Sequence, residues 1–335
     1  MPTVPNAQGI AEGASWLLQA LDPKSGLVRL VRMDREAYRA ASFLDDRMLA
    51  EHRATAVMPW ADVAAAVSPE ARKDARWIFH IGHVGSTLVS RLLGELPDVL
   101  SVREPRILRD VSALPAQRRQ RFTGPLPPLF SRTFAASELA LVKATSFVSE
   151  IAPELAVPGQ RALFMYANPR NYVASILAGE NSLKELTMLS RWREQRIAGR
   201  AFVAQPNTAA ELAGAAWACE MTALEAAAEA MADRKITWAN FDAMLADMPA
   251  ELGRVAAFFG FAASDAQLQA IGEGPLMQRY SKALEYDYSP SLRRDLIAET
   301  DAANRPDIDR AIAMLHSAAE TSPLLARALD RAKDD

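Results

Sequence analysis

The sequence predicts an α/β protein in which a mostly parallel sheet is covered by helices on both faces, preceded by a small N-terminal extension. The main observation is a series of short apolar runs, at residues 77–81, 99–102, 139–142, 162–166 and 235–238, with helical or turn-forming segments between them. Strands that alternate with helices form parallel sheets, and such sheets bind ligands beyond the carboxyl ends of their strands. Functional residues are therefore expected directly after each strand.

Composition narrows the possible partners and cofactors. The chain has 335 residues, of which 50% are hydrophobic and 24% charged, so apolar material for a core is ample. Its net charge of −3 argues against broad nucleic-acid binding. Cys219 is the single cysteine, so no intrachain disulfide forms, and the four histidines lack zinc-site spacing. We expect no metal and no nucleic-acid partner.

The sequence also predicts a cytoplasmic protein without a membrane anchor. Its first residues lack the basic start and apolar stretch of a signal peptide. The Ala-rich segment 212–232 is interrupted by Glu220, Glu225 and Glu229, which is typical of a soluble helix.

Residues 1–75 are predicted to form the N-terminal extension and residues 76–335 the main α/β domain. In the extension, residues 27–33 alternate like a strand, Asp34 is a plausible helix N-cap, and Pro59 interrupts the pattern before a short Ala-rich helix. In the main domain, leucines recur at helical spacing after the first strand until Pro97. Residues 118–132 are predicted as loops that shape an acceptor pocket, and residues 279–294 as a loop folded over the sheet edge.

The segment with the clearest chemistry joins the first of these strands to a helix through Gly82-His83-Val84-Gly85-Ser86-Thr87. Glycines let the backbone turn tightly so that successive N–H groups point into one concavity that suits an anion. The helix N-terminus adds unpaired N–H donors and a partial positive charge. The segment therefore predicts a phosphate-binding loop. The alternative is a plain strand–turn–helix whose glycines serve only the turn.

This loop lacks two familiar signatures. In an ATP- or GTP-binding loop a lysine follows the last glycine, whereas here Ser86 directly follows Gly85. The GxSxG nucleophile elbow of many hydrolases is also absent. Nucleoside-triphosphate chemistry and simple hydrolysis are therefore disfavoured.

Over roughly residues 77–290 the chain resembles the P-loop sulfotransferase superfamily, whose sulfuryl donor is 3′-phosphoadenosine 5′-phosphosulfate (PAPS). The resemblance implies a P-loop three-layer sandwich fold. It begins at residues 82–88, which look like the family's 5′-phosphosulfate loop. It implies donor contacts from the following loop residues: His83, Val84, Gly85, Ser86 and Thr87.

Two further segments of the resemblance imply the catalytic residues. Arg103-Glu104-Pro105-Arg106 is similar to the turn that carries the general base in tyrosylprotein and several bacterial sulfotransferases, which implies that Glu104 is the base. Val142-Lys143-Ala144-Thr145 resembles the strand end that carries Lys-Thr-His in the cytosolic enzymes, which implies a catalytic role for Lys143.

The resemblance also implies where the nucleotide's 3′-phosphate binds. Residues 168–175, Asn-Pro-Arg-Asn-Tyr-Val-Ala-Ser, look like the family's 3′-phosphate segment, with Arg170 and Ser175 as ligands. Tyr280 and Lys282 are the predicted cover over the adenine or the 3′-phosphate.

The chain departs from the family pattern at three positions. His83 stands where the family usually has lysine or arginine, and Ala167 where an arginine opens the 3′-phosphate segment. Thr145 replaces the histidine of Lys-Thr-His, so that residue offers no base.

The residues themselves leave alternatives for these roles. Glu104 follows a strand, where Arg103 and Arg106 can tune its pKa, but it can also be a solvated surface carboxylate paired with either arginine. Lys143 ends a buried strand and is costly to bury unless it meets an anion, although a snorkelling lysine is the alternative.

The remaining cations have similar alternatives. His83 can donate to a phosphate when protonated or can simply fill the loop. Arg170 can grip a phosphate as a bidentate fork, or can be an ordinary cation on a helix's first turn, where the macrodipole disfavours it unless an anion is near.

The leading hypothesis is an enzyme that transfers a sulfuryl group from PAPS to a hydroxyl or amine of a small-molecule or peptide acceptor, without a metal, a membrane or nucleic acid. A second hypothesis, favoured by Ala167 and Thr145, is a non-catalytic nucleotide-binding or regulatory protein on the same fold. A kinase with a degenerate loop is the third and weakest. The acceptor and the oligomeric state are not predicted.

Overall fold

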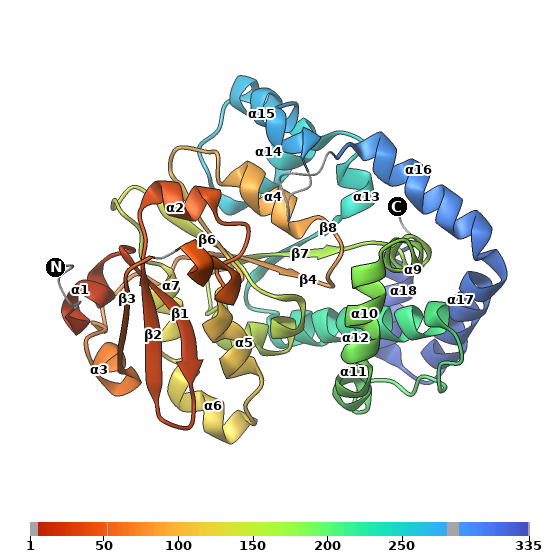
Figure 1. Ribbon diagram of the computed structural model, residues 1–335, viewed down its shortest axis with the longest axis horizontal. Helices are drawn as coiled ribbons and strands as arrows, with labels where there is room; N and C mark the ends of the chain where they lie inside the picture. The colour runs from red at the N-terminus through yellow and green to blue at the C-terminus, as the bar shows by residue number, and fades with distance from the viewer. Residues whose placement is uncertain (1–5, 52, 280–287, 334–335) are drawn as a thin grey trace.

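The central feature of the protein is a five-stranded parallel sheet with the strand order β5-β6-β4-β7-β8 (Figure 1). The computed structural model describes residues 6–51, 53–279 and 288–333. The sheet strands are β4 (Arg76–His80), β5 (Val99–Arg103), β6 (Leu139–Lys143), β7 (Arg161–Tyr166) and β8 (Lys235–Asn240). The predicted α/β fold class is confirmed.

Helices cover both faces of this sheet. In Figure 1, α4 (Ser86–Leu93) and α14 (Met248–Phe259) lie on one side, and the long helix α12 (Ala209–Ala230) lies on the other. Residues 77–80 of β4 are all buried because this central strand packs on both faces. All residues of the edge strand β5 are buried as well, and its last residue, Arg103, contacts the end of a helix from the N-terminal region. This explains why the strands appear in the sequence as continuous apolar runs.

The chain order of the strands places the loop after β4 at the point where ligands bind such sheets. β4 is the first strand of the sheet along the chain, yet it lies in the middle, between β6 and β7. The connections to β6 and β7 therefore run to opposite sides of β4, which opens a crevice beyond its carboxyl end.

The N-terminal region adds a second, three-stranded antiparallel sheet. Its strands are β1 (Trp16–Asp22), β2 (Leu27–Arg32) and β3 (Thr55–Pro59), and α2 (Arg35–Ala40) follows β2. The apolar residues of this region belong to the same continuous core as those of the main sheet. The division at residue 75 stays a prediction.

Arg103, the last residue of β5, joins α2 to the edge of the main sheet. Its side chain is 1% exposed. The guanidinium donates to the carbonyl oxygen of Ala41 from Nε at 2.9 Å, to the carbonyl of Tyr38, and to Ser101 Oγ at 2.8 Å. Burial lowers the pKa of this group. The carbonyls at the end of α2 are thus satisfied by a side chain of the sheet.

The remaining elements frame the sheet. The helices are α1 (Ala7–Glu12), α3 (Trp60–Ala65), α5 (Arg106–Ser112), α6 (Ala116–Thr123), α7 (Leu126–Phe130), α8 (Ala152–Leu155), α9 (Pro169–Leu177), α10 (Glu180–Met188), α11 (Ser190–Ile197), α13 (Phe241–Met244), α15 (Asp265–Gly272), α16 (Pro290–Ala303), α17 (Arg305–Ala319) and α18 (Pro323–Arg331). Three 3-10 helices are η1 (Asp46–Glu51), η2 (Ser146–Ile151) and η3 (Pro275–Gln278). None of the helices described is long and apolar enough to cross a membrane.

Parts of two predicted loops are helical in the structure. Most of residues 118–132 lie in α6 and α7, so the prediction of loops there was wrong; Pro115 precedes α6 at the N-cap, and Pro127 stands in the first turn of α7. Residues 290–294 belong to α16. Ser289 caps this helix by accepting a hydrogen bond from Leu292 N at 3.0 Å.

Replacing Arg103 by methionine is expected to destabilise the protein by about 3 kcal/mol, because buried carbonyl oxygens lose charged donors. Urea unfolding followed by circular dichroism measures the change. The matched control is Arg39→Met on the exposed side of α2, with an expected change within about 0.5 kcal/mol. Equal effects of the two substitutions would show that the α2 contact does not depend on Arg103.

Candidate functional site

Residues 82–87, the anion-loop candidate, have an unusual backbone. Gly82 has φ +80°, His83 +54° and Gly85 +60°, so three of the first four residues are left-handed. Glycine adopts this conformation freely, but His83 is strained in it. Strain of this kind is found where a loop is held in one shape, often at functional sites.

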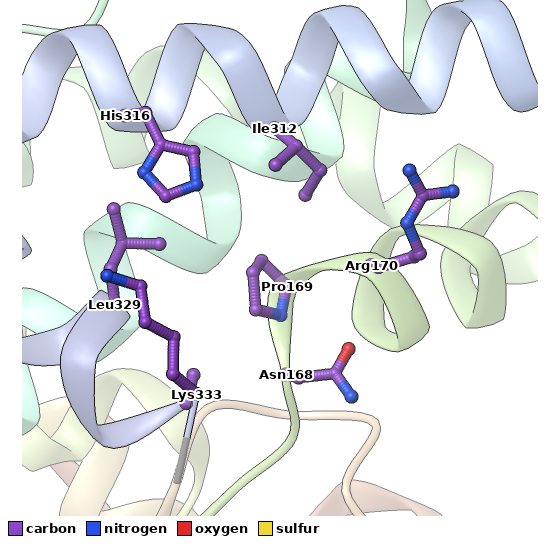
Figure 2. A pocket seen from close by; sticks show the side chains of 8 residues that line it. Asn168, Pro169, Arg170, Ile312, His316, Leu329 and Lys333 are labelled. Carbon is purple, nitrogen blue, oxygen red and sulfur yellow. The ribbon is translucent and has the colours of Figure 1, made fainter. Parts of the chain in front are cut away.

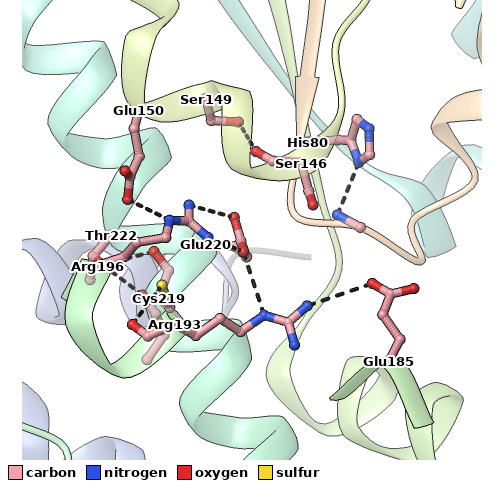
Figure 3. A network of polar contacts seen from close by, with 12 residues as sticks. His80, Ser146, Ser149, Glu150, Glu185, Arg193, Arg196, Cys219, Glu220 and Thr222 are labelled. Carbon is pink, nitrogen blue, oxygen red and sulfur yellow. Dashed lines mark hydrogen bonds and ion pairs between the residues drawn. The ribbon is translucent and has the colours of Figure 1, made fainter. Parts of the chain in front are cut away.

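His80 holds the start of this loop in place. Its Nδ1 accepts a hydrogen bond from Gly82 N at 2.9 Å (Figure 3), and its Nε2 lies 2.9 Å from the carbonyl oxygen of Ala144. Nδ1 is an acceptor, so the proton of the neutral ring is on Nε2 and is donated to Ala144. The 82–87 loop is therefore tied to the end of β6. His80 was not among the predicted site residues.

Gly85 is required by close packing as well as by its backbone angle. A Cβ atom at this position would lie 1.9 Å from Cζ of Phe241, the first residue of α13. Gly82 has room for a Cβ atom, because the nearest atom to it would be Ser146 Oγ at 3.7 Å, an ordinary contact distance. The Phe241 ring thus packs directly on the turn that starts α4.

Thr87 brings an unsatisfied polar group to the first turn of α4. The residue is 1% exposed, and its Oγ1 has no hydrogen-bond partner within the described part of the chain. A buried hydroxyl without a partner is costly. An oxygen of a bound anion at the α4 N-terminus would supply the missing partner. This observation fits a phosphate or phosphosulfate group at the loop.

Glu104 and Lys143 meet at the carboxyl ends of the adjacent strands β5 and β6. Lys143 Nζ forms an ion pair with Glu104 Oε1, and Thr145 Oγ1 donates to Glu104 Oε2 at 3.3 Å. The Lys143 side chain is 1% exposed and that of Glu104 12%. Glu104 has φ +52°, so its backbone is also held in the left-handed region. Ala144, bonded to His80, directly follows Lys143, which places this pair beside the 82–87 loop.

The two arginines next to Glu104 have other partners. Arg103 is bound to the carbonyls of α2, and Arg106 forms ion pairs with Asp46 and, at 3.2 Å, with Asp110. The ion pair shown for Glu104 joins it to Lys143. Among the described residues, the buried lysine of the next strand is thus a charged partner of Glu104, and neither arginine is shown paired with it.

Arg170 and Ser175, the predicted 3′-phosphate ligands, lie on α9. Arg170 Nη1 donates to Asp301 Oδ1 at 2.5 Å, and its Nη2 pairs with Asp309. These carboxylates, with hydrogen bonds first among the causes, raise the pKa of Arg170. Ser175 Oγ donates to the carbonyl of Tyr172 at 2.8 Å within the same helix. A phosphate at Arg170 would compete with two aspartates.

A small pocket of about 200 Å³ adjoins the N-terminus of α9 (Figure 2). Asn168, Pro169 and Arg170 form one wall, and His316 and Lys333 of the C-terminal helical region lie across from them. The two cations beside this space, Arg170 and Lys333, are both paired, with Asp301 and Asp309 and with Asp330 respectively.

Arg293 is a cation near the loop that the sequence did not single out. Its guanidinium lies 5.2 Å from the centroid of the Phe241 ring and donates from Nη2 to Asp242 Oδ1 at 3.0 Å. Asp242 also accepts from Asn171 Nδ2 at 2.8 Å, which links α9, α13 and α16. Sequence analysis placed Arg293 in a loop because residues 279–294 are rich in turn formers. Its contact with Phe241, 52 residues earlier, has no local signal.

The structure thus brings the 82–87 loop, Glu104 and Lys143 together and places Arg170 and Ser175 on the helix after β7. The ring of His83 packs edge-on against Tyr172, with centroids 6.4 Å apart. The predicted adenine cover, Tyr280 and Lys282, lies outside the described residues. In the described ranges, no group of three or more His, Cys, Asp or Glu is arranged to hold a metal ion.

Comparison with known proteins gives the following. No family model and no curated protein matches the chain. Among solved structures, a sulfotransferase domain from the curacin biosynthetic pathway is 12% identical, with 74% of this chain and 99% of that chain covered and a TM-score of 0.42.

Two further structural matches are also sulfotransferases. A mouse sulfotransferase complexed with PAP is 11% identical, with coverages of 78% and 89% and a TM-score of 0.39. A sulfotransferase from Alicyclobacillus acidocaldarius is 18% identical, with coverages of 73% and 96% and a TM-score of 0.35. At such low identities and TM-scores, these similarities carry no functional conclusion for this chain.

Alanine substitutions at the two loop glycines should have unequal effects. Gly82→Ala is expected to cost about 1 kcal/mol, the price of a left-handed alanine, since the space is open. Gly85→Ala adds an overlap with Phe241 and should cost at least about 2 kcal/mol more. Urea unfolding of both variants measures the difference. Equal costs would mean that the Phe241 ring moves away from the loop without penalty.

Proposed function

We propose that this protein is a sulfotransferase-like enzyme that transfers a sulfuryl group from PAPS to a hydroxyl or amine acceptor. The observation that carries the proposal is the buried Glu104–Lys143 pair beside a loop that has no lysine of its own. A base and a cation next to an anion-binding loop are the groups that sulfuryl transfer needs. The acceptor hydroxyl loses a proton, and negative charge develops on the transferred group and the leaving phosphate.

Each residue has a role in this proposal. The backbone N–H groups of residues 82–87 and the hydroxyl of Thr87 bind the phosphate end of the donor. Glu104 accepts the acceptor's proton, and Thr145 orients it by a hydrogen bond to its second oxygen. Lys143 shares its positive charge between Glu104 and the oxygens of the reacting group. His80 keeps the loop at a fixed position relative to this pair.

The residues present fit the two ends of PAPS unequally. At the phosphosulfate end, Thr87 has a buried hydroxyl without a partner, and the loop backbone is shaped for an anion. At the 3′-phosphate end, Ala167 has no side-chain donor and Arg170 is paired with two aspartates. Binding there requires that the phosphate displaces at least one carboxylate.

The 3′-phosphate end also supports a second candidate function, a non-catalytic nucleotide-binding or regulatory protein on the same fold. The ion pairs of Arg170 with Asp301 and Asp309 are the observation that favours the non-catalytic candidate, because they compete with a 3′-phosphate and so weaken the site for the sulfuryl donor. The enzyme would turn over PAPS and the non-catalytic protein would not, whereas both would have the same 82–87 loop.

Isothermal titration with 3′,5′-ADP tests the proposal, and binding in the micromolar to millimolar range is expected. Asp309 is largely exposed, so Asp309→Asn should leave the fold intact, free one side of Arg170 and raise the affinity by roughly threefold to tenfold. Asp295→Asn, exposed on α16, is the matched control and should change nothing. Folded protein that does not bind 3′,5′-ADP at millimolar concentration would rule out the enzyme proposal.

Glu104→Gln tests the base. Removal of a general base is expected to lower the rate of acceptor-dependent release of 3′,5′-ADP from PAPS by about 10² to 10⁴ while the nucleotide still binds. Glu70→Gln, at an exposed position, is the control and should keep full activity. Thermal unfolding checks that the uncompensated Lys143 has not unfolded the protein. Unchanged turnover in the folded Glu104→Gln variant would assign the base elsewhere.

A further inference from the structure

A pocket away from the Glu104–Lys143 pair has no role in the proposed chemistry. Its volume is about 540 Å³, within the usual range for small-molecule sites, and it is enclosed by α10, α11, α12 and the segment between α11 and α12. Its apolar floor consists of the side chains of Leu186, Ile197 and Ala216, all buried. Leu183, Val203 and Leu212 extend the apolar lining toward the solvent.

Two large hydrophobic side chains stand exposed at positions adjacent in sequence to this lining. Met188 is 76% exposed and follows the lining residue Thr187. Phe202 is 80% exposed and precedes the lining residue Val203. A ligand with an apolar body would gain from the floor and from these two side chains.

The second observation is a buried arginine in the wall of the pocket. Arg193 is 8% exposed, and its Nε and Nη1 have no hydrogen-bond partner among the residues that the structure describes. The neighbouring carboxylates, Glu185 and Glu220, each approach it only to 3.7 Å (Figure 3). These distances give ion pairs but not hydrogen bonds. Two donors of this buried guanidinium therefore make no hydrogen bond, although two carboxylates lie within ion-pair distance of it.

Glu220 does not need Arg193 for its own stability. It accepts hydrogen bonds from Arg196 at 2.7 and 3.2 Å, and Arg196 also pairs with Glu150 at 2.8 Å. Figure 3 shows this second guanidinium between the two carboxylates. Arg193 thus lines the pocket beside a complete ion-pair arrangement, and two of its donors make no hydrogen bond.

Charge complementarity indicates the sign of the missing partner. The pocket is lined by two arginines, Arg191 and Arg193, and by one glutamate, Glu194. A planar guanidinium binds a carboxylate, sulfate or sulfonate through paired donors. The ion pairs of Arg193 with Glu185 and Glu220 leave its hydrogen-bonding capacity unmet, and a buried donor without a hydrogen bond is costly.

We propose that this pocket binds an amphiphilic small molecule, with its apolar body on the Leu186–Ile197–Ala216 floor and its anionic group on Arg193. No residue of the 82–87 loop lines this pocket, so the proposal stands whether or not that loop binds a nucleotide. A neutral apolar molecule, or a segment of another protein chain, would contact the apolar floor without an ionic contact to Arg193.

Two fluorescent probes of matched shape test this site: anilinonaphthalene sulfonate, which is anionic, and phenylnaphthylamine, which is neutral. Both should bind the full-length protein with a rise in fluorescence. Arg193→Gln should weaken binding of the sulfonate by at least about tenfold, because a buried charge pair is lost, and leave the neutral probe unchanged. Arg193→Lys keeps the charge and should restore part of the sulfonate affinity.

A second variant locates the site independently of the charge. Ala215 lines the pocket, so Ala215→Phe fills existing space and should abolish binding of both probes without unfolding the protein. Ala230→Phe, exposed at the end of the same helix, is the matched control and should bind both probes like the unmodified chain. Thermal unfolding of every variant confirms the folded state.

The opposite results would overturn the proposal. Full binding of both probes by Ala215→Phe would place them at another surface. Unchanged or equally changed binding of the two probes in Arg193→Gln would show that Arg193 does not select for an anionic group, and unchanged binding is expected for a neutral ligand or a docking protein segment.

Discussion

The two hydrogen bonds of the His80 ring are the constraint on which the candidate site depends. One ring nitrogen receives the N–H of Gly82, and the other donates to the carbonyl of Ala144, so a single side chain fixes both the start of the 82–87 loop and the end of β6. Since Lys143 precedes Ala144 and pairs with Glu104 on β5, the loop, the lysine and the carboxylate are held in one frame. The ring is 5% exposed, which protects these bonds from exchange with water.

Buried charge is the second physical theme of the structure. Arg103, Lys143 and Arg193 are each at least nine-tenths buried, and burial of a charge is tolerated only with partners. Arg103 satisfies backbone carbonyls and so joins the N-terminal region to the sheet. Lys143 meets a carboxylate at a strand end, whereas Arg193 keeps unused donors at a pocket wall. A buried cation therefore has a structural role at Arg103, a candidate catalytic role at Lys143 and a candidate binding role at Arg193, and its partners decide which role it has.

Much of the main sheet could be predicted from sequence, because its strands are buried on both faces and appear as short apolar runs. The runs at 77–81 and 162–166 correspond to β4 (Arg76–His80) and β7 (Arg161–Tyr166). The first strand of the N-terminal sheet was missed: six of its seven residues are buried, without the alternation that marks a half-exposed strand. The helices α6 and α7 were missed because prolines near their starts resemble loop signals, although proline suits the first helical turn.

By itself the sequence determined the local features: the glycines of the 82–87 loop, the polar residues that follow β5 and β6, and the absence of a lysine after Gly85. Backbone preferences and strand-end positions act over a few residues, so they can be read along the chain. Only the tertiary structure decided which charges meet. Arg170 is paired with Asp301, 131 residues later, and Gly85 is covered by Phe241. Partners so distant in the chain are chosen by the packing of helices around the sheet, and no local pattern encodes that choice.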